Sequence, residues 1–187
     1  MAAKTLVNTV RTAPVSRALR ERVSAVLEEN YAFMDSPIFR RKHAEAELFG
    51  SEEPALPMVS WYQPTRDDTE TAATGQPQLM KAAEERLMFY RYNYAKLRLK
   101  QLQRTIKRDG LTKKLALDFL EWHRRYEHHR EFIARTNLAL VLAMAKRTRL
   151  GDIDFAEIVS EGNMALLRAV EKFNVDRGFK FSTYACR

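Results

Sequence analysis

The segment Asp154–Phe173, DFAEIVSEGNMALLRAVEKF, predicts an amphipathic helix. Asp154 can cap its first turn, because its side chain can accept from the exposed amides, and Glu157 can reach back to the capping residue. Apolar residues and one glycine then recur at helical steps, which places them on one buried face. This predicted stripe consists of Phe155, Ile158, Val159, Gly162, Leu166, Ala169, Val170 and Phe173.

Gly162 lies on this stripe although glycine costs a helix about 1 kcal/mol relative to alanine. We therefore expect a neighbouring helix to approach closely there. A second face of the same helix is too mixed for a core, and either solvent or a protein partner that receives the helix in a groove would suit it. This face carries Ala156, Glu157, Ser160, Glu161, Asn163 and Leu167.

The chain changes character after Phe173. Asn174–Gly178 predicts a turn, and in Phe179–Tyr184, FKFSTY, aromatic residues alternate with a cation and hydroxyls. Aromatic rings stack on unpaired bases at about 1–3 kcal/mol each, while cations and hydroxyls hold phosphates. Short aromatic segments also pack into cores, so the residues alone leave both interpretations open.

The rest of the main body also predicts helices. One helix should run from Gln78 to a turn at Asp109-Gly110, and a second from about Thr112 to Lys146, with a candidate break near His128. No alternating strand pattern follows residue 76. The fold class expected is all-α, a compact helical bundle.

Composition divides the chain into three parts. Residues 1–50 form an N-terminal extension that is weakly helical, and residues 51–77 form a linker with four prolines. The linker composition cannot bury enough apolar surface to offset the entropy of ordering, so the extension should be partly disordered. Residues 78–187 form the helical domain, incomplete at its C-terminus.

The net charge of +8 is concentrated in the middle of the chain, where residues 80–149 hold 18 Lys or Arg against 7 Asp or Glu. Such a block favours nucleic acid as the partner, with anionic lipid and ordinary solvated helix faces as alternatives. The longest apolar run, Leu138–Ala145, is far below the ~20 residues that span a bilayer. Met1–Val10 lacks a secretory apolar core, so we expect a cytoplasmic location and no membrane partner.

The sequence gives little support for catalysis. Cys186 is the single cysteine and has no histidine near it in the sequence. His123 and His128 are five residues apart, whereas ligands on one helix face need three or four, and His129 does not complete a site. We therefore predict no catalytic residue, no metal, no cofactor and no enzyme activity.

Three segments resemble the second conserved region of bacterial RNA polymerase sigma factors of the housekeeping class. They are NLALVLAMAKR from Asn137, the helix segment from Asp154, and DRGFKFSTYA from Asp176, with no gap between Phe155 and Ala185. Pro77–Leu99 is more weakly similar to the helix that precedes this region in the family. The resemblance implies a bundle like sigma region two.

The resemblance also implies roles for individual residues. The mixed helix face would bind the coiled coil of the largest subunit of core RNA polymerase, through Ala156, Glu157, Ser160, Glu161, Asn163 and Leu167. Phe173 and Tyr184 would capture the flipped adenine of the minus-ten element, with Phe181 as packing. The remaining contacts to the non-template strand would come from Arg177, Phe179, Lys180, Ser182 and Thr183. The basic residues Lys96, Arg98, Lys100 and Arg104 would face DNA.

The function implied is that of a transcription initiation factor that binds core polymerase and helps to melt the minus-ten element, acting at the bacterial nucleoid. The alternative is a truncated sigma-like protein that occupies core polymerase as a competitor or regulator; an anti-sigma factor is a further candidate partner. Ala156 and Ser160 stand where the family usually has Leu and Gln, which puts core binding in question. The later family regions are missing, so we expect a fragment of a longer sigma factor, with a naturally short protein as the alternative.

Overall fold

The computed structural model describes residues 15–51, 80–147 and 154–186, and the regular elements in this part of the chain are all helical, which confirms the expected fold class. No helix among these residues is both long and apolar enough to cross a membrane. The elements, in chain order, are α1 (Arg17–Leu27), η1 (Pro37–Arg40), α2 (Ala44–Phe49), α3 (Ala82–Asp109), α4 (Lys113–Thr136), α5 (Leu138–Arg147), α6 (Phe155–Lys172), η2 (Val175–Arg177) and α7 (Phe181–Ala185).

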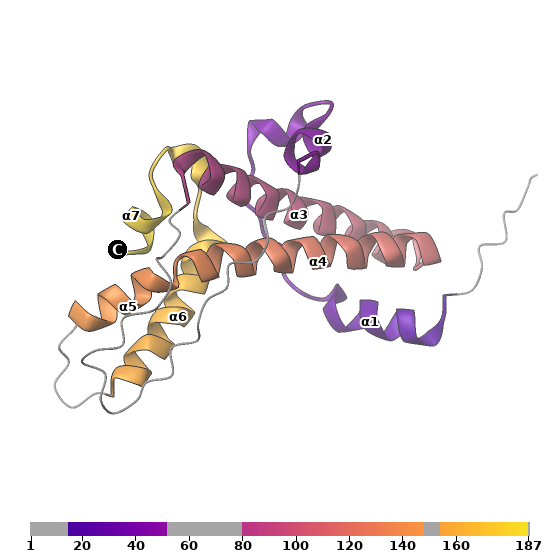
Figure 1. Ribbon diagram of the computed structural model, residues 1–187. Coiled ribbons are helices and arrows are strands. Elements are labelled where there is room, and N and C mark those ends of the chain that lie inside the picture. Colours follow the sequence, from indigo (N-terminus) through magenta and orange to yellow (C-terminus); the bar gives the residue numbers. More distant parts are fainter. Residues whose placement is uncertain (1–14, 52–79, 148–153, 187) are drawn as a thin grey trace, which may run out of the picture.

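The long helices α3 and α4 form an antiparallel hairpin that runs through the whole molecule (Figure 1). Helix α3 ends at Gly110, whose φ of 87° lies in the left-handed region that favours glycine, so the predicted Asp-Gly stop is confirmed. Helix α4 is capped by Thr112, whose Oγ1 accepts a hydrogen bond from the backbone N–H of Leu115 at 3.2 Å.

The break in the second predicted helix lies at Asn137, so the expectation of a break near His128 is wrong. Asn137 ends α4 with its own side chain, because Nδ2 donates to the carbonyl of Ile133 at 2.8 Å. Its carbonyl then accepts from the N–H of Leu140 at 3.0 Å in the first turn of α5. His129 is fully buried inside α4, and its Nδ1 lies 2.6 Å from the carbonyl oxygen of Arg125.

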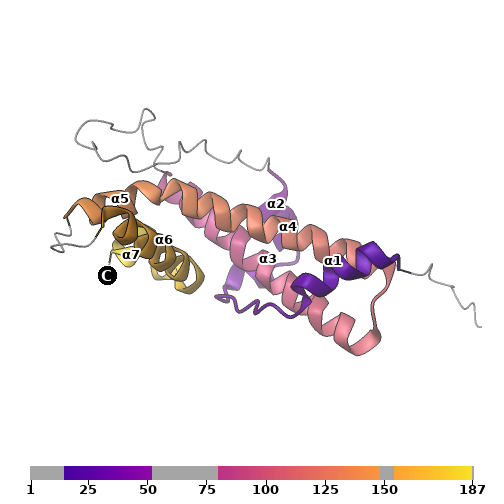
Figure 2. The same ribbon diagram turned by 90° about the horizontal axis from the view of Figure 1, so that it is seen from below.

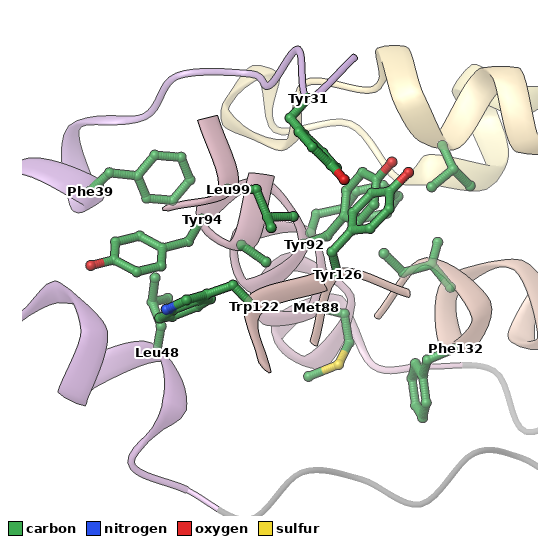
Figure 3. Packing of buried hydrophobic residues seen from close by; sticks show 14 of the residues in the cluster. Tyr31, Phe39, Leu48, Met88, Tyr92, Tyr94, Leu99, Trp122, Tyr126 and Phe132 are labelled. Atoms are coloured by element: carbon green, nitrogen blue, oxygen red, sulfur yellow. The ribbon is translucent and has the colours of Figure 1, made fainter. Parts of the chain in front are cut away.

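Tyrosine rings fill the middle of the core, as Figure 3 shows. Tyr92 of α3 stacks on Tyr126 of α4, with their centroids 5.6 Å apart. Tyr31 meets Tyr126 edge-on at 5.7 Å, and burial raises the pKa of both Tyr31 and Tyr92. Tyr31 belongs to the segment between α1 and η1, so part of the N-terminal extension contributes to the main core.

In the described part of the N-terminal extension, helices α1 and α2 pack on the hairpin, with α1 beside α4 and α2 beside α3 (Figures 1 and 2). Val23 of α1 and Leu48 of α2 are buried. Arg91 of α3 is buried as well, and its guanidinium donates to the carbonyl of Leu48 and, at 2.6 Å, to Oγ of Ser51. The expected boundary between linker and domain falls within residues 52–79, outside the described residues.

The four basic residues of α3 expected to face DNA differ in exposure. Lys96 is only 4% exposed and its ammonium lies 4.8 Å from the centroid of the Tyr92 ring, so the expectation that it faces DNA is wrong. Burial lowers the pKa of Lys96 to about 8. The guanidinium carbon of Arg98 lies 5.5 Å from the centroid of the Trp122 ring. The ammonium of Lys100 lies 5.6 Å from the centroid of the Phe33 ring in the N-terminal extension, whereas Arg104 is exposed. Net charge alone therefore does not define a DNA-facing surface on α3.

Candidate nucleic-acid interface

Helix α6 packs on α5, carries the mixed face and leads into the loop before α7. Oδ1 of Asp154 accepts from the N–H of Ala156 at 3.2 Å, which confirms Asp154 as the capping residue, whereas the expected return contact from the Glu157 side chain is not among the hydrogen bonds of the described residues. A Cβ built on Gly162 would lie 2.6 Å from Cγ1 of Val141, which confirms the close approach of a neighbouring helix. Within the predicted stripe Leu166 is buried, whereas its first four residues are half-buried: Phe155, Ile158, Val159 and Gly162.

The mixed face of α6 is accessible in this structure. Glu157, Ser160 and Glu161 are exposed, whereas Ala156, Asn163 and Leu167 are half-buried. Oδ1 of Asn163 has no hydrogen-bond partner within the described part of the chain. The Oδ1 atom of Asn163 is itself buried, so the face presents two exposed carboxylates, Glu157 and Glu161, and it suits a partner that offers cations.

The loop after α6 is held by its own side chains and by α3. Oδ1 of Asn174 accepts from the N–H of Asp176 at 3.0 Å, and Gly178 turns the chain with a φ of 76°. Tyr90 of α3 donates its hydroxyl to Oδ1 of Asp176 at 2.6 Å, and burial, together with this contact, raises the pKa of Tyr90. This loop is thus tied to the central hairpin.

Helix α7 is tied to α3 in the same way. Its first residue, Phe181, donates its N–H to Oε1 of Glu85 at 3.0 Å. The Phe181 ring is fully buried, and its centroid lies 5.1 Å from Phe89 and 5.3 Å from Phe173, so the expected packing role is confirmed. Phe173 lies 4.7 Å from Phe89 and is only 2% exposed. The rings of Phe89, Phe173 and Phe181 therefore pack against one another, and this cluster forms the floor beneath the loop.

A pocket of about 330 Å³ lies against Phe173, the one of these three rings that lines it, and its volume is at the lower end of the ~300–1,000 Å³ typical of small-ligand sites. Its aromatic lining is graded in exposure, because Phe173 is buried while Tyr184 is 37% and Phe179 64% exposed. The Tyr184 centroid lies 5.5 Å from that of Phe173. The lining residues are Met34, Lys172, Phe173, Asn174, Arg177, Phe179, Thr183 and Tyr184.

Most of the predicted DNA-binding residues meet at this pocket. Phe173, Arg177, Phe179, Thr183 and Tyr184 all line it. Lys180 is exposed and lines a smaller hollow of about 40 Å³, and Ser182 is half-buried within α7. A flat ring that enters the pocket would meet aromatic side chains within it and cations at Lys172 and Arg177. This combination suits an unpaired base on a phosphate backbone.

Three lining residues were absent from the prediction. Lys172 and Asn174 flank Phe173 directly, so their positions in the sequence could have indicated them. Met34 could not have been found in this way, because it belongs to the N-terminal extension and no local pattern links it to Phe173.

Residues 133–187 match the family model described as sigma-70 region 2. This segment of the chain is therefore similar to sigma-70 region 2. The matched segment, called region 2 from here on, comprises α5, α6, η2 and α7, together with the end of α4. It contributes every residue of the pocket lining named above except Met34.

Curated relatives match the same segment. The chain is 46% identical over 59 residues to RNA polymerase sigma factor SigA of Lactococcus lactis subsp. cremoris, which is 32% of this chain and 16% of that protein. It is 48% identical over 56 residues to RNA polymerase principal sigma factor HrdC of Streptomyces coelicolor, 30% of this chain and 16% of the relative. RNA polymerase sigma factor RpoD of Helicobacter pylori is 47% identical over 53 residues, 28% of this chain and 8% of the relative. The chain thus spans 16% or less of these relatives' lengths.

Proposed function

We propose that this protein acts as a sigma factor in bacterial transcription initiation. It binds core RNA polymerase, acts in the cytoplasm at the nucleoid, and recognises the non-template strand of the minus-ten element as that strand opens. The observation that carries this proposal is the aromatic pocket of region 2, with Lys172 and Arg177 beside Phe173 and Tyr184.

The chemistry at the pocket is physical and involves no bond cleavage. Extruding a base from a duplex costs a few kcal/mol, and stacking on an aromatic ring returns about 1–3 kcal/mol. Tyr184 and Phe179 are exposed enough to stack, while Phe173 forms the floor that holds Tyr184 in place. Lys172 and Arg177 attract the phosphates of either form, so the preference for the opened strand comes from stacking of the unpaired base.

Core polymerase binds at the mixed face of α6 in this proposal. Glu157 and Glu161 are exposed there and complement a basic surface, such as one on the coiled coil of the largest subunit. An anti-sigma factor would regulate the protein by covering the same face. Because this face and the pocket use different residues, core binding and strand binding should be separable by mutation.

The proposal is tested by adding the 187-residue chain to core polymerase on a promoter that carries a fluorescent base analogue in the minus-ten element. Binding together with a fluorescence increase on strand opening is the expected result. Binding without opening would instead identify a competitor that occupies core polymerase. Failure to bind core polymerase would contradict both functions.

Two variants assign the two surfaces. Glu161→Lys should weaken core binding and leave the binding of a single-stranded minus-ten oligonucleotide by the free chain unchanged, whereas Tyr184→Ala should do the reverse. Glu21→Lys is the charge-matched control, since Glu21 lies on α1 in an exposed ion pair with Arg17 that contributes little to stability. Equal losses of core binding in Glu161→Lys and Glu21→Lys would show that net charge, and not the α6 face, controls binding.

A further inference from the structure

The segment between α1 and η1 brings Met34 to the pocket of region 2. The N–H of Met34 donates to Oδ1 of Asn93 at 2.9 Å, and Nδ2 of Asn93 donates to the carbonyl of Phe89 at 3.0 Å. Asn93 is buried, so both bonds are shielded from water. The Phe89 ring in turn packs on Phe173 in the pocket floor. The backbone at Met34 is therefore fixed relative to the floor.

A second contact joins the N-terminal extension to the pocket wall. The ring of Phe39 in η1 meets the ring of Tyr90 edge-on, with centroids 6.3 Å apart. Tyr90 holds Asp176 through its hydroxyl, and Asp176 lies between the lining residues Asn174 and Arg177. The extension thus supports the loop and also lines the pocket.

From these contacts we infer that Met34 is a specificity-determining residue of the pocket, which selects for a base inserted from a single strand. The inference rests on the proposed function, because it assigns the same pocket to a base. Met34 contributes an unbranched, polarisable thioether, which adapts to the face or edge of an aromatic ring. Lys172 and Arg177 can hold a phosphate whether or not a base is present, whereas Met34 has no charge and can favour only the base itself.

The test compares two single-stranded oligonucleotides that carry the non-template strand of a minus-ten element. One is intact, and its twin has an abasic site in place of the flipped adenine. Fluorescence anisotropy with the whole chain gives the ratio of the two affinities. Met34→Ala should lower this ratio about fivefold, the size expected when the side chain no longer contacts the base, and Met34→Leu, which keeps an apolar side chain of similar volume, should retain most of it.

Met164→Ala is the matched control, because Met164 is 48% exposed on α6 and does not line the pocket. Its ratio should equal that of the wild-type chain. If Met34→Ala weakens the binding of both oligonucleotides equally, the effect does not act on the base and the inference is overturned.

Tyr184→Ala separates failure of the inference from failure of the proposed function. If Tyr184→Ala abolishes the preference for the intact strand while Met34→Ala keeps it, the inference fails and the base pocket stands. If neither variant changes the ratio, the pocket does not bind the base and the proposed function fails with the inference.

Discussion

Tyr90 on α3 donates a 2.6 Å hydrogen bond to Oδ1 of Asp176 in η2, and this bond joins the central hairpin to the loop that lines the pocket. The two residues are far apart in the sequence, and the bond forms only because the end of region 2 folds back on α3. The position of Asn174 and Arg177 in the pocket therefore depends on a residue outside region 2.

Tyr90→Phe should lower the free energy of unfolding by about 1 kcal/mol, the usual net value of one hydrogen bond. It should also weaken the binding of a single-stranded minus-ten oligonucleotide, because the loop loses its anchor. Chemical denaturation and fluorescence anisotropy measure the two effects. Tyr94→Phe, one turn further along α3, is the control and should leave oligonucleotide binding unchanged; equal behaviour of the two variants would contradict the anchoring role.

Phe173→Ala and Tyr184→Ala should differ sharply in stability. Phe173 is buried against two other phenylalanine rings, so its truncation should cost about 3–5 kcal/mol of unfolding free energy. Tyr184 is 37% exposed, so Tyr184→Ala should cost much less and should act mainly on strand binding. Thermal unfolding followed by circular dichroism checks this difference. Comparable unfolding free energies for the two variants would contradict the floor assigned to Phe173.

Gly162→Ala should not stabilise the protein, although alanine favours a helix by about 1 kcal/mol over glycine. The new Cβ would lie 2.6 Å from Cγ1 of Val141, and a β-branched side chain in a helix has little freedom to move away. Overpacking of this kind costs about 1–3 kcal/mol, which equals or exceeds the gain in propensity.

A double-mutant cycle with Val141→Ala tests the origin of this effect. In the Val141→Ala background the steric conflict is gone, so Gly162→Ala should become stabilising by up to about 1 kcal/mol. Unfolding free energies of the four proteins give the coupling. If Gly162→Ala has the same effect in both backgrounds, contact with Val141 does not explain the glycine.

Lys96→Met should stabilise the protein at neutral pH, by about 1–2 kcal/mol, because it removes a buried ammonium. Burial lowers the pKa of Lys96 from the ordinary 10.5 to about 8 in the folded state. Between these two pH values the unfolded chain binds the proton and the folded chain does not, so this lysine's contribution to stability rises with pH. The advantage of Lys96→Met should therefore shrink from about pH 8 towards pH 10.5.

Chemical denaturation at several pH values gives the unfolding free energies of the variant and the wild type. Their difference measures this trend, because the contributions of the other titrating groups cancel in it. Lys114→Met, which makes the same change at an exposed position of α4, is the control. A constant difference across the range would show that Lys96 keeps an ordinary pKa in the folded protein.

The amino-acid sequence by itself determined the features that depend on neighbours within a few residues. The Asp154 cap, the Asp109-Gly110 stop and the stripe that contains Gly162 follow from the hydrogen-bonding needs of helix ends and from helical periodicity. The likeness of Asp154–Ala185 to sigma region two is also local, because it depends on an ungapped run of residues.

Only the tertiary structure decided which side chains are accessible and which residues far apart in the sequence meet. Phe173 and Tyr184 are both aromatic residues of one segment, but Phe173 forms the floor because α3 and Phe181 cover it. Met34 lines the pocket, and Lys96 is buried, because each packs against elements that are distant in the sequence. Burial depends on surfaces that the whole chain brings together, so no pattern of a few neighbouring residues can specify it.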